Sequence, residues 1–594
     1  MFEAFEREAV YITSLGRTLY RMRHAKPDSH LTVTDIVQGF GRDTPQAPAI
    51  FFEDRIVSYR ELNAQANRYA RWALAQGVRQ GDVVALLMEN RPEYLFAWLG
   101  IVRIGAIAAL LNTNLRGAAL AHSIGVANAA HLVLGSELAD SLAEARPLIE
   151  APPRLWATGA CVAGADDLDA ALAAQSSDAL DADVRRGLTG KDKALYIFTS
   201  GTTGLPKAAN ITHLRLLFMM YGFAGGLGAK ASDRTYNVLP LYHSAGGICA
   251  VGIALTAGGA IVLRRKFSAR DFWDDCYRYR ATFFQYIGEL CRYLLNAPPG
   301  PHERDHMIRA ITGNGLRPEI WPIFQKRFAI PRIVEFYGAT EGNVSMLNYD
   351  GKVGAVGRIP HYMRKILTTR IVRFDIAREM PVRGADGLCI ECADGEVGEA
   401  VGKIANEPGK TFEGYTKASD TEKKILRDVF EKGDAWFRTG DLMRQDEDGY
   451  FYFVDRIGDT FRWKGENVAT SEVAEALGVV PAIKEANVYG VAVPGMDGRA
   501  GMAALVAGPE FDARTLAAQL ASNLPAYARP VFLRLMPQME ITGTFKQRKL
   551  DLVQEGFDPA KIADPLYWLD PATGRYEPLD AARYADIVAG RVKL

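Results

Sequence analysis

Short apolar runs that alternate with helical segments constrain the fold of this chain most. The first 111 residues hold a strand over 49–52, a helix from the capping box of Ser58 and Glu61 towards residue 76, a strand over 82–88, a helix over 94–105 and an apolar run over 106–111. Such alternation is typical of parallel, doubly wound α/β layers. The pattern recurs over 194–263 and 309–340.

The 594 residues are too many for one compact core. Turn residues and charges crowd around short aromatic strands between 395 and 460, which indicates a β-rich subdomain. We therefore expect a large N-terminal α/β domain over 1–456 and a small, mobile α+β domain over 457–594. The small domain is predicted to contain a helix over 471–478, strands over 485–493 and 502–507, and a helix over 512–522.

Charge and cysteine content exclude some classes of protein. Lysine plus arginine, at 70, equals aspartate plus glutamate, so no basic field favours nucleic acid as a partner. Six cysteines do not make a disulfide framework in so long a chain. Cys389 and Cys392 lie on a predicted short strand, with no second pair to complete a zinc site. We interpret both as structural, in a reduced, cytoplasmic protein.

No stretch is long and apolar enough to cross a membrane, and the segment over 236–263 is interpreted as buried strand and loop. Residues 1–23 carry apolar side chains at helical spacing, followed by Arg17, Arg21 and Arg23 on the polar side. Such a helix could lie on an anionic membrane surface as a peripheral contact, or pack on its own domain.

The sharpest local motif is an apolar strand that runs into hydroxyls and glycines and ends on a lysine. It contains Thr199, Ser200, Gly201, Thr202, Thr203, Gly204 and Lys207. Glycines let a backbone approach a ligand closely, and N–H groups, hydroxyls and an ammonium suit phosphate oxygens. The spacing differs from that of a Walker A loop, because no Ser or Thr follows the lysine.

This run resembles the phosphate loop of the adenylate-forming superfamily of acyl-CoA synthetases, peptide-synthetase adenylation domains and luciferases. Further motifs of that superfamily follow in order: Gly313-Asn314-Gly315, Tyr337-Gly338-Ala339-Thr340-Glu341, Phe437-Arg438-Thr439-Gly440-Asp441, and Asp455-Arg456. The segments 458–468 and 542–546 resemble more narrowly the very-long-chain acyl-CoA synthetase and fatty-acid-transport-protein branch. The resemblance covers about residues 40 to 560.

The resemblance implies that the protein binds ATP and Mg²⁺ and uses them to activate the carboxylate of its substrate. Glu341 would hold the metal and Thr340 would donate to the α-phosphate. The loop of Gly313, Asn314 and Gly315 would contact the adenine, and Tyr337 and Gly338, at the start of the motif that carries Thr340 and Glu341, would bind the nucleotide. Asp441 would bind the ribose, and Arg456 would contact the same ribose or the phosphate. Lys546 from the small domain would neutralise charge as a catalytic residue.

The resemblance also implies the acyl and coenzyme A sites. Tyr242 and His243 match the aromatic-histidine segment that borders the acyl pocket. Gly458 stands at the hinge about which the small domain rotates for the second half-reaction, and Lys464 and Gly465 would then meet the pantetheine arm of coenzyme A.

The predicted function is a long- or very-long-chain fatty acid–CoA ligase that works through an acyl-adenylate. Two alternatives stay open: an acyl-AMP ligase that loads a carrier protein, and a fatty-acid uptake protein that acts by trapping acyl-CoA. Bulky carboxylates such as bile acids also stay open as substrates.

Overall fold

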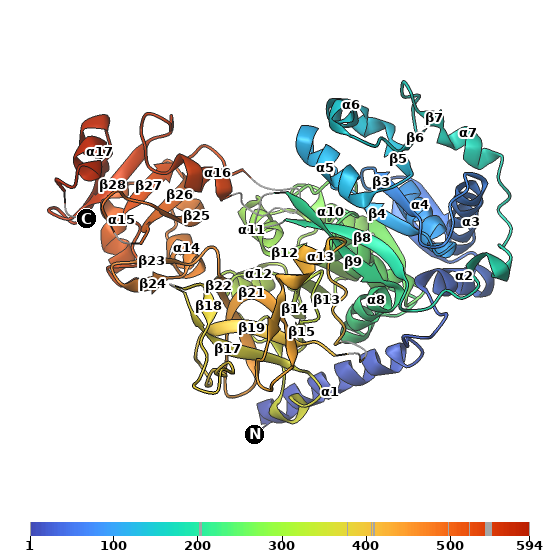
Figure 1. Cartoon of the computed structure of the whole chain (residues 1–594), viewed down its shortest axis with the longest axis horizontal. Coiled ribbons are helices and arrows are strands. Elements are labelled where there is room, and N and C mark those ends of the chain that lie inside the picture. Colours follow the sequence, from blue (N-terminus) through green and yellow to red (C-terminus); the bar gives the residue numbers. More distant parts are fainter. Residues whose placement is uncertain are drawn as a thin grey trace. The chain divides into compact units, whose positions relative to one another are not determined.

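The computed structural model describes residues 2–200, 205–376, 378–405, 407, 410–496, 498–521, 523–540, 549–592 and 594. The chain divides into two compact units (Figure 1). Unit 1 comprises 1–316, 320–358 and 404–425, and unit 2 comprises 317–319, 359–403 and 426–594.

One sheet of unit 1 has seven strands. Their order is β7 (Asp166–Asp167), β6 (Arg154–Thr158), β5 (His131–Gly135), β3 (Val83–Leu87), β4 (Ile107–Leu110), β8 (Lys193–Ser200) and β9 (Pro206–Thr212). All neighbours pair in parallel except β8 and β9, which form an antiparallel hairpin. The chain crosses from β4 back over β3 to β5, so the sheet is doubly wound, as the alternation predicted.

The second sheet of unit 1 has eight strands. Their order is β15 (Ser345–Asn348), β14 (Ile333–Gly338), β13 (Ala310–Asn314), β12 (Phe283–Ile287), β10 (Arg234–Asn237), β11 (Ala260–Leu263), β1 (Pro48–Phe52) and β2 (Arg55–Ser58). The six inner strands pair in parallel, and the two edge strands are antiparallel to their neighbours. The predicted α/β class is therefore confirmed in both sheets.

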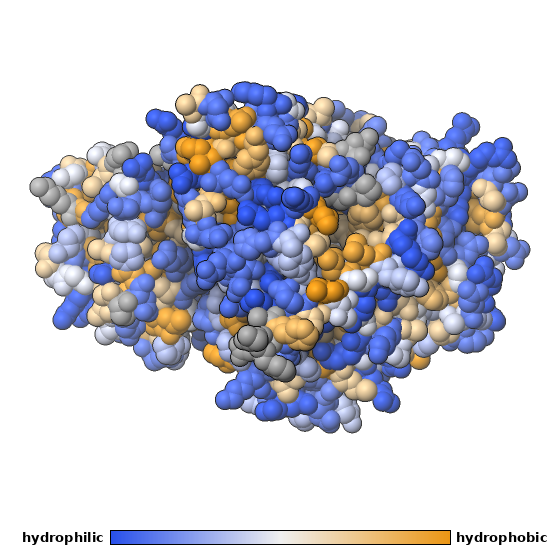
Figure 2. Space-filling view, turned by 90° about the horizontal axis from the view of Figure 1, so that it is seen from below, coloured by the Kyte–Doolittle hydropathy of each residue, from blue (hydrophilic) through white to orange (hydrophobic). Residues whose placement is uncertain are grey.

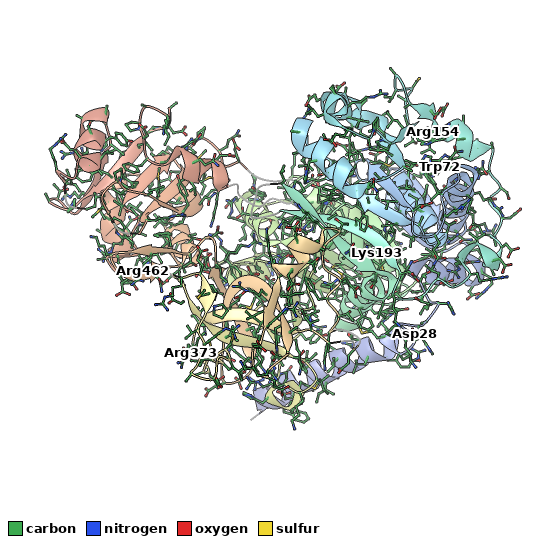
Figure 3. All side chains as sticks on the ribbon, in the orientation of Figure 1. Asp28, Trp72, Arg154, Lys193, Arg373 and Arg462 are labelled. Carbon is green, nitrogen blue, oxygen red and sulfur yellow. The ribbon has the colours of Figure 1, made fainter. Side chains whose placement is uncertain are left out.

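Helices surround these sheets (Figure 1). In unit 1 they are α1 (Phe2–Met22), α2 (Val33–Asp43), α3 (Tyr59–Ala75), α4 (Pro92–Arg103), α5 (Gly117–Ala127), α6 (Ala139–Ala145), α7 (Leu168–Ala173), α8 (His213–Leu227), η4 (Ala245–Ala250), α9 (Val251–Leu255), α10 (Phe272–Arg278), α11 (Gly288–Asn296), α12 (Trp321–Arg327) and α13 (Ala418–Glu422). The Ser58 side chain accepts from the Glu61 N–H and so begins α3 as predicted. On α3, Trp72 packs edge-on against Trp156, with 5.3 Å between the ring centres, close to Arg154 (Figure 3).

The segment 236–263 is partly helical, contrary to the strand and loop predicted there. A π-helix, η4, continues into α9 between β10 and β11. A Cβ on Gly246 or Gly247 would lie 2.4 Å or 2.0 Å from backbone oxygens of Pro240 and Leu241. These glycines suggested a loop, but they permit a helix to pack directly against the preceding chain.

The N-terminal helix α1 packs on α8. A Cβ on Gly225 would lie 2.5 Å from the Cα of Thr18, so the two helices approach closely. Arg17 donates to the Gly225 carbonyl and Arg21 donates to the Ala229 carbonyl, at 3.2 and 2.6 Å. Of the two alternatives for this helix, packing on its own domain therefore holds for the side of Arg17 and Arg21, which cap the carbonyl end of α8. In the described part of the chain, no helix is both long and apolar enough to cross a membrane.

Unit 2 contains an antiparallel β-rich part, which was predicted as part of the large domain over 1–456, and a C-terminal α+β part. The first includes β17 (Thr369–Asp375), β18 (Met380–Pro381), β19 (Gly398–Lys403), β21 (Ala435–Gln445) and β22 (Tyr450–Arg456). The second has a hairpin of β23 (Phe461–Trp463) and β24 (Glu466–Val468), and a sheet of β25 (Ile483–Val491), β26 (Ala500–Ala507), β27 (Phe532–Leu535), β28 (Leu566–Asp570) and β29 (Arg575–Pro578). Its helices are α14 (Thr470–Gly478), α15 (Ala513–Ala521), α16 (Leu550–Glu555) and α17 (Ala581–Val588).

The two cysteines at 389 and 392 are free thiols in this unit. Instead of the predicted strand, the backbone makes isolated bridges at Cys389 and Glu391. Cys389 is buried, and burial raises the pKa of both thiols. Among the residues that the structure describes, no three metal-ligating side chains gather into a site.

A buried histidine at the start of α8 should make stability depend on pH. His213 is fully buried, and neither ring nitrogen has a hydrogen-bond partner within the described ranges. Burial lowers the pKa of His213 to about 4, whereas the unfolded ring titrates near 6.5. The unfolded chain therefore takes up a proton first, and stability falls as the pH drops from about 6.5 to about 4.

We expect this histidine to cost about 3 kcal/mol of stability at the lower pH, from a pKa difference of roughly 2.5. Urea unfolding of the wild type and of His213→Leu at pH 7 and near pH 4 measures it. Between pH 7 and pH 4, the free energy of unfolding of the wild type should fall by that amount relative to that of the variant. A difference that stays constant with pH would contradict this assignment.

Candidate functional site

The predicted phosphate loop connects β8 to β9. Thr199 pairs with Lys207 and Ser200 with Pro206 in the antiparallel register of this hairpin. Gly201, Thr202, Thr203 and Gly204 lie outside the described residues. The Lys207 ammonium lies 3.0 Å from the Asp420 carboxylate and 5.7 Å from the centre of the Tyr415 ring. This ion pair connects the β8–β9 hairpin to α13.

The predicted metal carboxylate, Glu341, follows β14 and lies in the same unit. The Tyr415 hydroxyl donates to Glu341 Oε1 at 2.8 Å. Burial raises the pKa of Tyr415, the Glu341 charge raises it further, and a hydrogen bond with Thr199 opposes the shift. The phenol therefore stays protonated and connects the end of β8 to the carboxylate.

Arg215 supports the turn that carries Thr340 and Glu341. Its guanidinium donates to the Ala339 carbonyl at 2.8 Å and to the Thr340 carbonyl at 2.8 and 3.1 Å. Burial lowers the pKa of Arg215, while the negative charges of Glu341 and Glu413 raise it. The guanidinium thus fixes the backbone on which Glu341 is mounted, with a positive charge behind the carboxylate.

The predicted adenine loop ends β13. A Cβ on Gly313 would lie 2.3 Å from the Tyr286 carbonyl oxygen, and Gly315 has a φ of +81°, so both positions favour glycine. Glu335 on β14 is buried and accepts from the Leu316 N–H at 2.9 Å and from the Tyr286 hydroxyl. Burial raises the pKa of Glu335 to about 8. These bonds fix the loop against the strand that leads to Tyr337 and Gly338.

The predicted acyl-pocket residues lie between β10 and η4. Tyr242 is buried, its hydroxyl accepts from Asn114 at 2.9 Å, and burial raises its pKa to about 12. His243 Nδ1 accepts from the Ala245 N–H at 3.3 Å. The next residue, Ser244, lies 3.1 Å from Thr340 between hydroxyl oxygens. The structure therefore places the aromatic-histidine segment directly beside the Thr340–Glu341 turn.

Asp441 and Arg456 lie together in unit 2. They are paired across β21 and β22, and Arg456 Nε lies 3.6 Å from Asp441 Oδ1. Gly440, with a φ of +79°, donates to buried Glu399, which also binds the Arg438 guanidinium at 2.8 Å. These interactions of Glu399 fix the backbone at Gly440, directly before Asp441.

The predicted hinge follows in the same unit. Asp459 and Thr460 both donate from their N–H groups to the Arg456 carbonyl at 3.0 Å, which makes a tight turn around Gly458. Gly458 has no φ in the left-handed region, and no atom lies within 4 Å of an added Cβ. Lys464 and Gly465, with φ of +52° and +84°, form the two-residue turn between β23 and β24. Lys546 lies outside the described residues.

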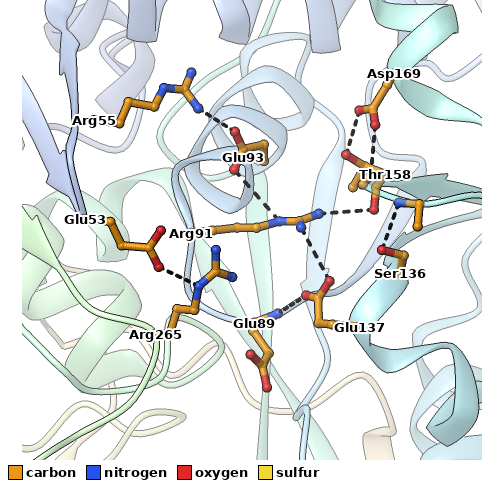
Figure 4. Close-up of polar contacts among 12 residues, drawn as sticks. Glu53, Arg55, Glu89, Arg91, Glu93, Ser136, Glu137, Thr158, Asp169 and Arg265 are labelled. Atoms are coloured by element: carbon orange, nitrogen blue, oxygen red, sulfur yellow. Dashed lines mark hydrogen bonds and ion pairs between the residues drawn. The ribbon is translucent and has the colours of Figure 1, made fainter.

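A separate hollow of about 760 Å³ opens on unit 1 where β1, β3 and β6 end. Figure 4 shows that its charged side chains bind one another rather than point freely into it. Its three arginines pair with carboxylates at 2.8 to 3.4 Å: Arg55 with Glu93, Arg91 with Glu137, and Arg265 with Glu53. We assign these ion pairs a structural role, because they connect the loops that follow neighbouring strands.

Sequence patterns did not identify Tyr415, Arg215 or Glu335. Tyr415 lies in a segment of turns and charges, and Arg215 reads as an ordinary residue in the first turn of a helix. Glu335 lies in an apolar strand, where a carboxylate is itself unusual and could have served as a signal.

Comparison with protein families decides the relationship. The model of the AMP-binding enzyme family matches residues 37–398, and that of the AMP-binding enzyme C-terminal domain matches residues 472–546. The first match alone spans more than half of the chain. The chain belongs to the AMP-binding enzyme family. The resemblance seen in the sequence motifs is thereby confirmed.

Relatives in this family extend over nearly the whole chain. Long-chain fatty acid transport protein 6 of Mus musculus is 41% identical, covering 100% of this chain and 96% of its own length. Long-chain fatty acid transport protein 2 of Rattus norvegicus is 42% identical, covering 98% and 94%. Long-chain fatty acid transport protein 1 of Homo sapiens is 44% identical, covering 90% and 84%.

Solved structures of other proteins have a similar fold. ATP-bound MatB from Rhodopseudomonas palustris matches with a TM-score of 0.73 and 24% identity, covering 88% of this chain and 99% of its own. The Bacillus subtilis o-succinylbenzoate coenzyme A synthetase MenE, in complex with ATP and magnesium ion, matches with a TM-score of 0.69 and 24% identity, covering 86% and 98%. The chain therefore shares its overall fold with these two proteins.

Proposed function

We propose that this AMP-binding family member is a long- or very-long-chain fatty acid–CoA ligase. It would join ATP, a fatty acid and coenzyme A into acyl-CoA, AMP and pyrophosphate through an acyl-adenylate. The observation that carries the proposal is the convergence of Thr199, Lys207 and Glu341 on Tyr415 in unit 1. The names of the relatives supply the acyl class.

Glu341 fits a magnesium ligand. One carboxylate is enough for this metal in a nucleotide site, because phosphate and water usually complete its six positions. Glu341 Oε2 makes no hydrogen bond with any part of the chain that the structure describes. Bound Mg²⁺ would supply positive charge to the phosphates of ATP, and Glu341 would hold it there.

In the first half-reaction, the fatty acid carboxylate attacks the α-phosphorus and the bond to the pyrophosphate oxygen breaks. Thr340 and the β8–β9 hairpin would donate hydrogen bonds to the phosphates. Lys546 would neutralise the incoming carboxylate and the charge that develops on the α-phosphate. Asp441 suits paired ribose hydroxyls, because an ionised carboxylate only accepts hydrogen bonds.

In the second half-reaction, the thiol of coenzyme A attacks the acyl carbonyl and AMP leaves. By analogy with the family, the small domain turns about Gly458, and Lys464 and Gly465 then meet the pantetheine arm. Tyr242 and His243 would form the wall of the acyl pocket.

A panel of carboxylates from short to very long, with bile acids included, tests this proposal. AMP formation is measured for each with and without coenzyme A. Acyl-CoA formed best from long chains would support a fatty acid–CoA ligase. Acyl-AMP that accumulates despite coenzyme A, and disappears when an acyl carrier protein is added, would support the carrier-loading alternative.

The uptake alternative is separated by cells that express wild type or Lys546→Ala. Uptake that falls together with ligase activity means that acyl-CoA trapping drives it. Uptake that persists in the variant means a transport role separate from the ligase.

We also propose that α1 contacts a lipid surface from the cytoplasmic side. Phe5, Ile12, Leu19 and Tyr20 are 57 to 75% exposed on the side of α1 that faces away from α8. Figure 2 looks onto the side of the molecule where α1 lies in Figure 1, and hydrophobic residues gather there. Arg23 and Lys26 are exposed beside the end of α1, and residues 9–27 contain no carboxylate, which favours anionic lipid.

Flotation with vesicles tests this contact, with neutral phosphatidylcholine compared with mixtures that contain phosphatidylglycerol. We expect wild type to float with anionic vesicles, and Ile12→Asp with Leu19→Asp to lower the bound fraction at least fivefold, since each buried side chain contributes roughly 1.5 kcal/mol or more. Ile56→Asp, which changes a residue 58% exposed on β2, is the matched control. Equal binding of all three proteins would contradict the proposal.

A further inference from the structure

Tyr415 is held beside the β8–β9 hairpin by backbone hydrogen bonds of the residues that flank it. The Asn210 N–H donates to the Gly414 carbonyl and the Thr416 N–H donates to the Ala208 carbonyl, both at 3.0 Å. Ala209 and Tyr415 make an isolated antiparallel bridge. The segment around Tyr415 therefore adds to the free edge of β9, although 203 residues separate Asn210 from Glu413, to whose carbonyl the Asn210 side chain donates.

This placement puts one phenol in contact with two predicted ATP-site motifs. Its hydroxyl donates to Glu341 Oε1 at 2.8 Å and also interacts with Thr199 at the end of β8. Tyr415 itself is only 7% exposed. A buried phenol with a carboxylate acceptor gives a short, directional contact, so it restricts the rotation of the Glu341 side chain.

We propose that Tyr415 is a positioning residue for the metal-binding carboxylate, holding Glu341 Oε1 so that Oε2 is presented to Mg²⁺ bound with ATP. This inference rests on the proposed function. It deepens that function by assigning a role to a residue outside the predicted motifs.

Arg215 completes the support from the opposite side. Within the described residues, the hydrogen bonds of its side chain all go to backbone carbonyls, those of Ala339 and Thr340. The N-cap Thr212 accepts from the Arg215 N–H at 3.2 Å, so the arginine is itself fixed at the start of α8. Arg215 thus sets the backbone of the turn and Tyr415 sets the side chain. Without the phenol, Glu341 could turn towards the Arg215 charge.

The test is equilibrium binding of α,β-methylene-ATP, an analogue in which the bond broken in adenylation is blocked. Calorimetric titrations of the full chain are made with Mg²⁺ and with a chelator. For Tyr415→Phe we expect affinity in the chelator within twofold of wild type, and affinity with Mg²⁺ weakened by about tenfold, as for loss of a hydrogen bond to a charged group. On a Glu341→Gln background, the same change should have no further effect.

Tyr59→Phe is the matched control. The Tyr59 hydroxyl is buried in the same unit and donates to the Gly259 carbonyl at 2.8 Å, away from the predicted ATP motifs. It should lower the melting temperature without changing either affinity. If Tyr415→Phe weakens binding equally with and without Mg²⁺, or adds its full loss to that of Glu341→Gln, the positioning role is wrong. Wild type that binds no analogue with Mg²⁺ would instead overturn the proposed function itself, and this inference with it.

Discussion

Lys546→Ala is expected to slow acyl-AMP formation by roughly 10²- to 10³-fold, the effect of removing one group that stabilises charge in a transition state. Two anions meet in this step, so a missing ammonium raises its barrier. The second half-reaction does not create that charge. Conversion of supplied acyl-AMP and coenzyme A into acyl-CoA should therefore stay within a few-fold of wild type.

Pyrophosphate release measures the first step, and chromatography of acyl-CoA measures the second. Arg548→Ala, which removes a neighbouring positive charge, is the control and should leave both rates close to normal. A Lys546→Ala enzyme that forms acyl-AMP at the wild-type rate would remove this lysine from the mechanism. A loss of both steps together would point to a folding defect of the small domain.

Gly458→Pro should have the opposite pattern. Proline fixes φ near −65° at residue 458 and disfavours helical backbone at Ile457, so it removes torsional freedom from the turn closed by the Arg456 carbonyl. If the small domain turns about this residue, acyl-AMP should form within a few-fold of the normal rate, while its conversion to acyl-CoA falls by about 10²-fold or more, since an unproductive geometry costs at least that much.

Gly458→Ala is the matched control for the hinge. Because open space surrounds an added Cβ and the φ is not left-handed, alanine fits and both steps should proceed almost normally. Lys549 bonds Asp459 and Thr470 at 3.0 Å, so this ion pair also stabilises the turn. Normal thioester formation by Gly458→Pro would exclude rotation about this residue.

Hydrophobic periodicity and capping signals predicted several of the elements. The helix from Ser58 and the strand over 82–88 correspond to α3 and β3, and the helix over 471–478 corresponds to α14. The prediction was wrong at 236–263, where glycines permit η4 and α9 to pack against preceding backbone. Local patterns indicate a break at such glycines, because residue types alone do not show how closely the helix approaches the backbone of Pro240 and Leu241.

The motifs located the candidate site but not its supports. Thr199, Thr340 and Glu341 stand in motifs with their own residue pattern. Tyr415 reaches them only because its segment pairs with β9, a long-range contact that no local pattern encodes. The acceptors of Arg17 and Arg21 were likewise not predicted, because they are carbonyls near the end of α8, 208 residues away in the chain.

The central claim is that one chain makes an acyl-adenylate from a fatty acid and passes the acyl group to coenzyme A. Its most direct test is a single-turnover reaction with excess enzyme, ATP, Mg²⁺ and a labelled long-chain fatty acid, followed by addition of coenzyme A. The label should move first into acyl-AMP and then, on addition of the thiol, into acyl-CoA faster than acyl-AMP hydrolyses. Label that never enters acyl-AMP, or that remains there after coenzyme A is added, would contradict the account.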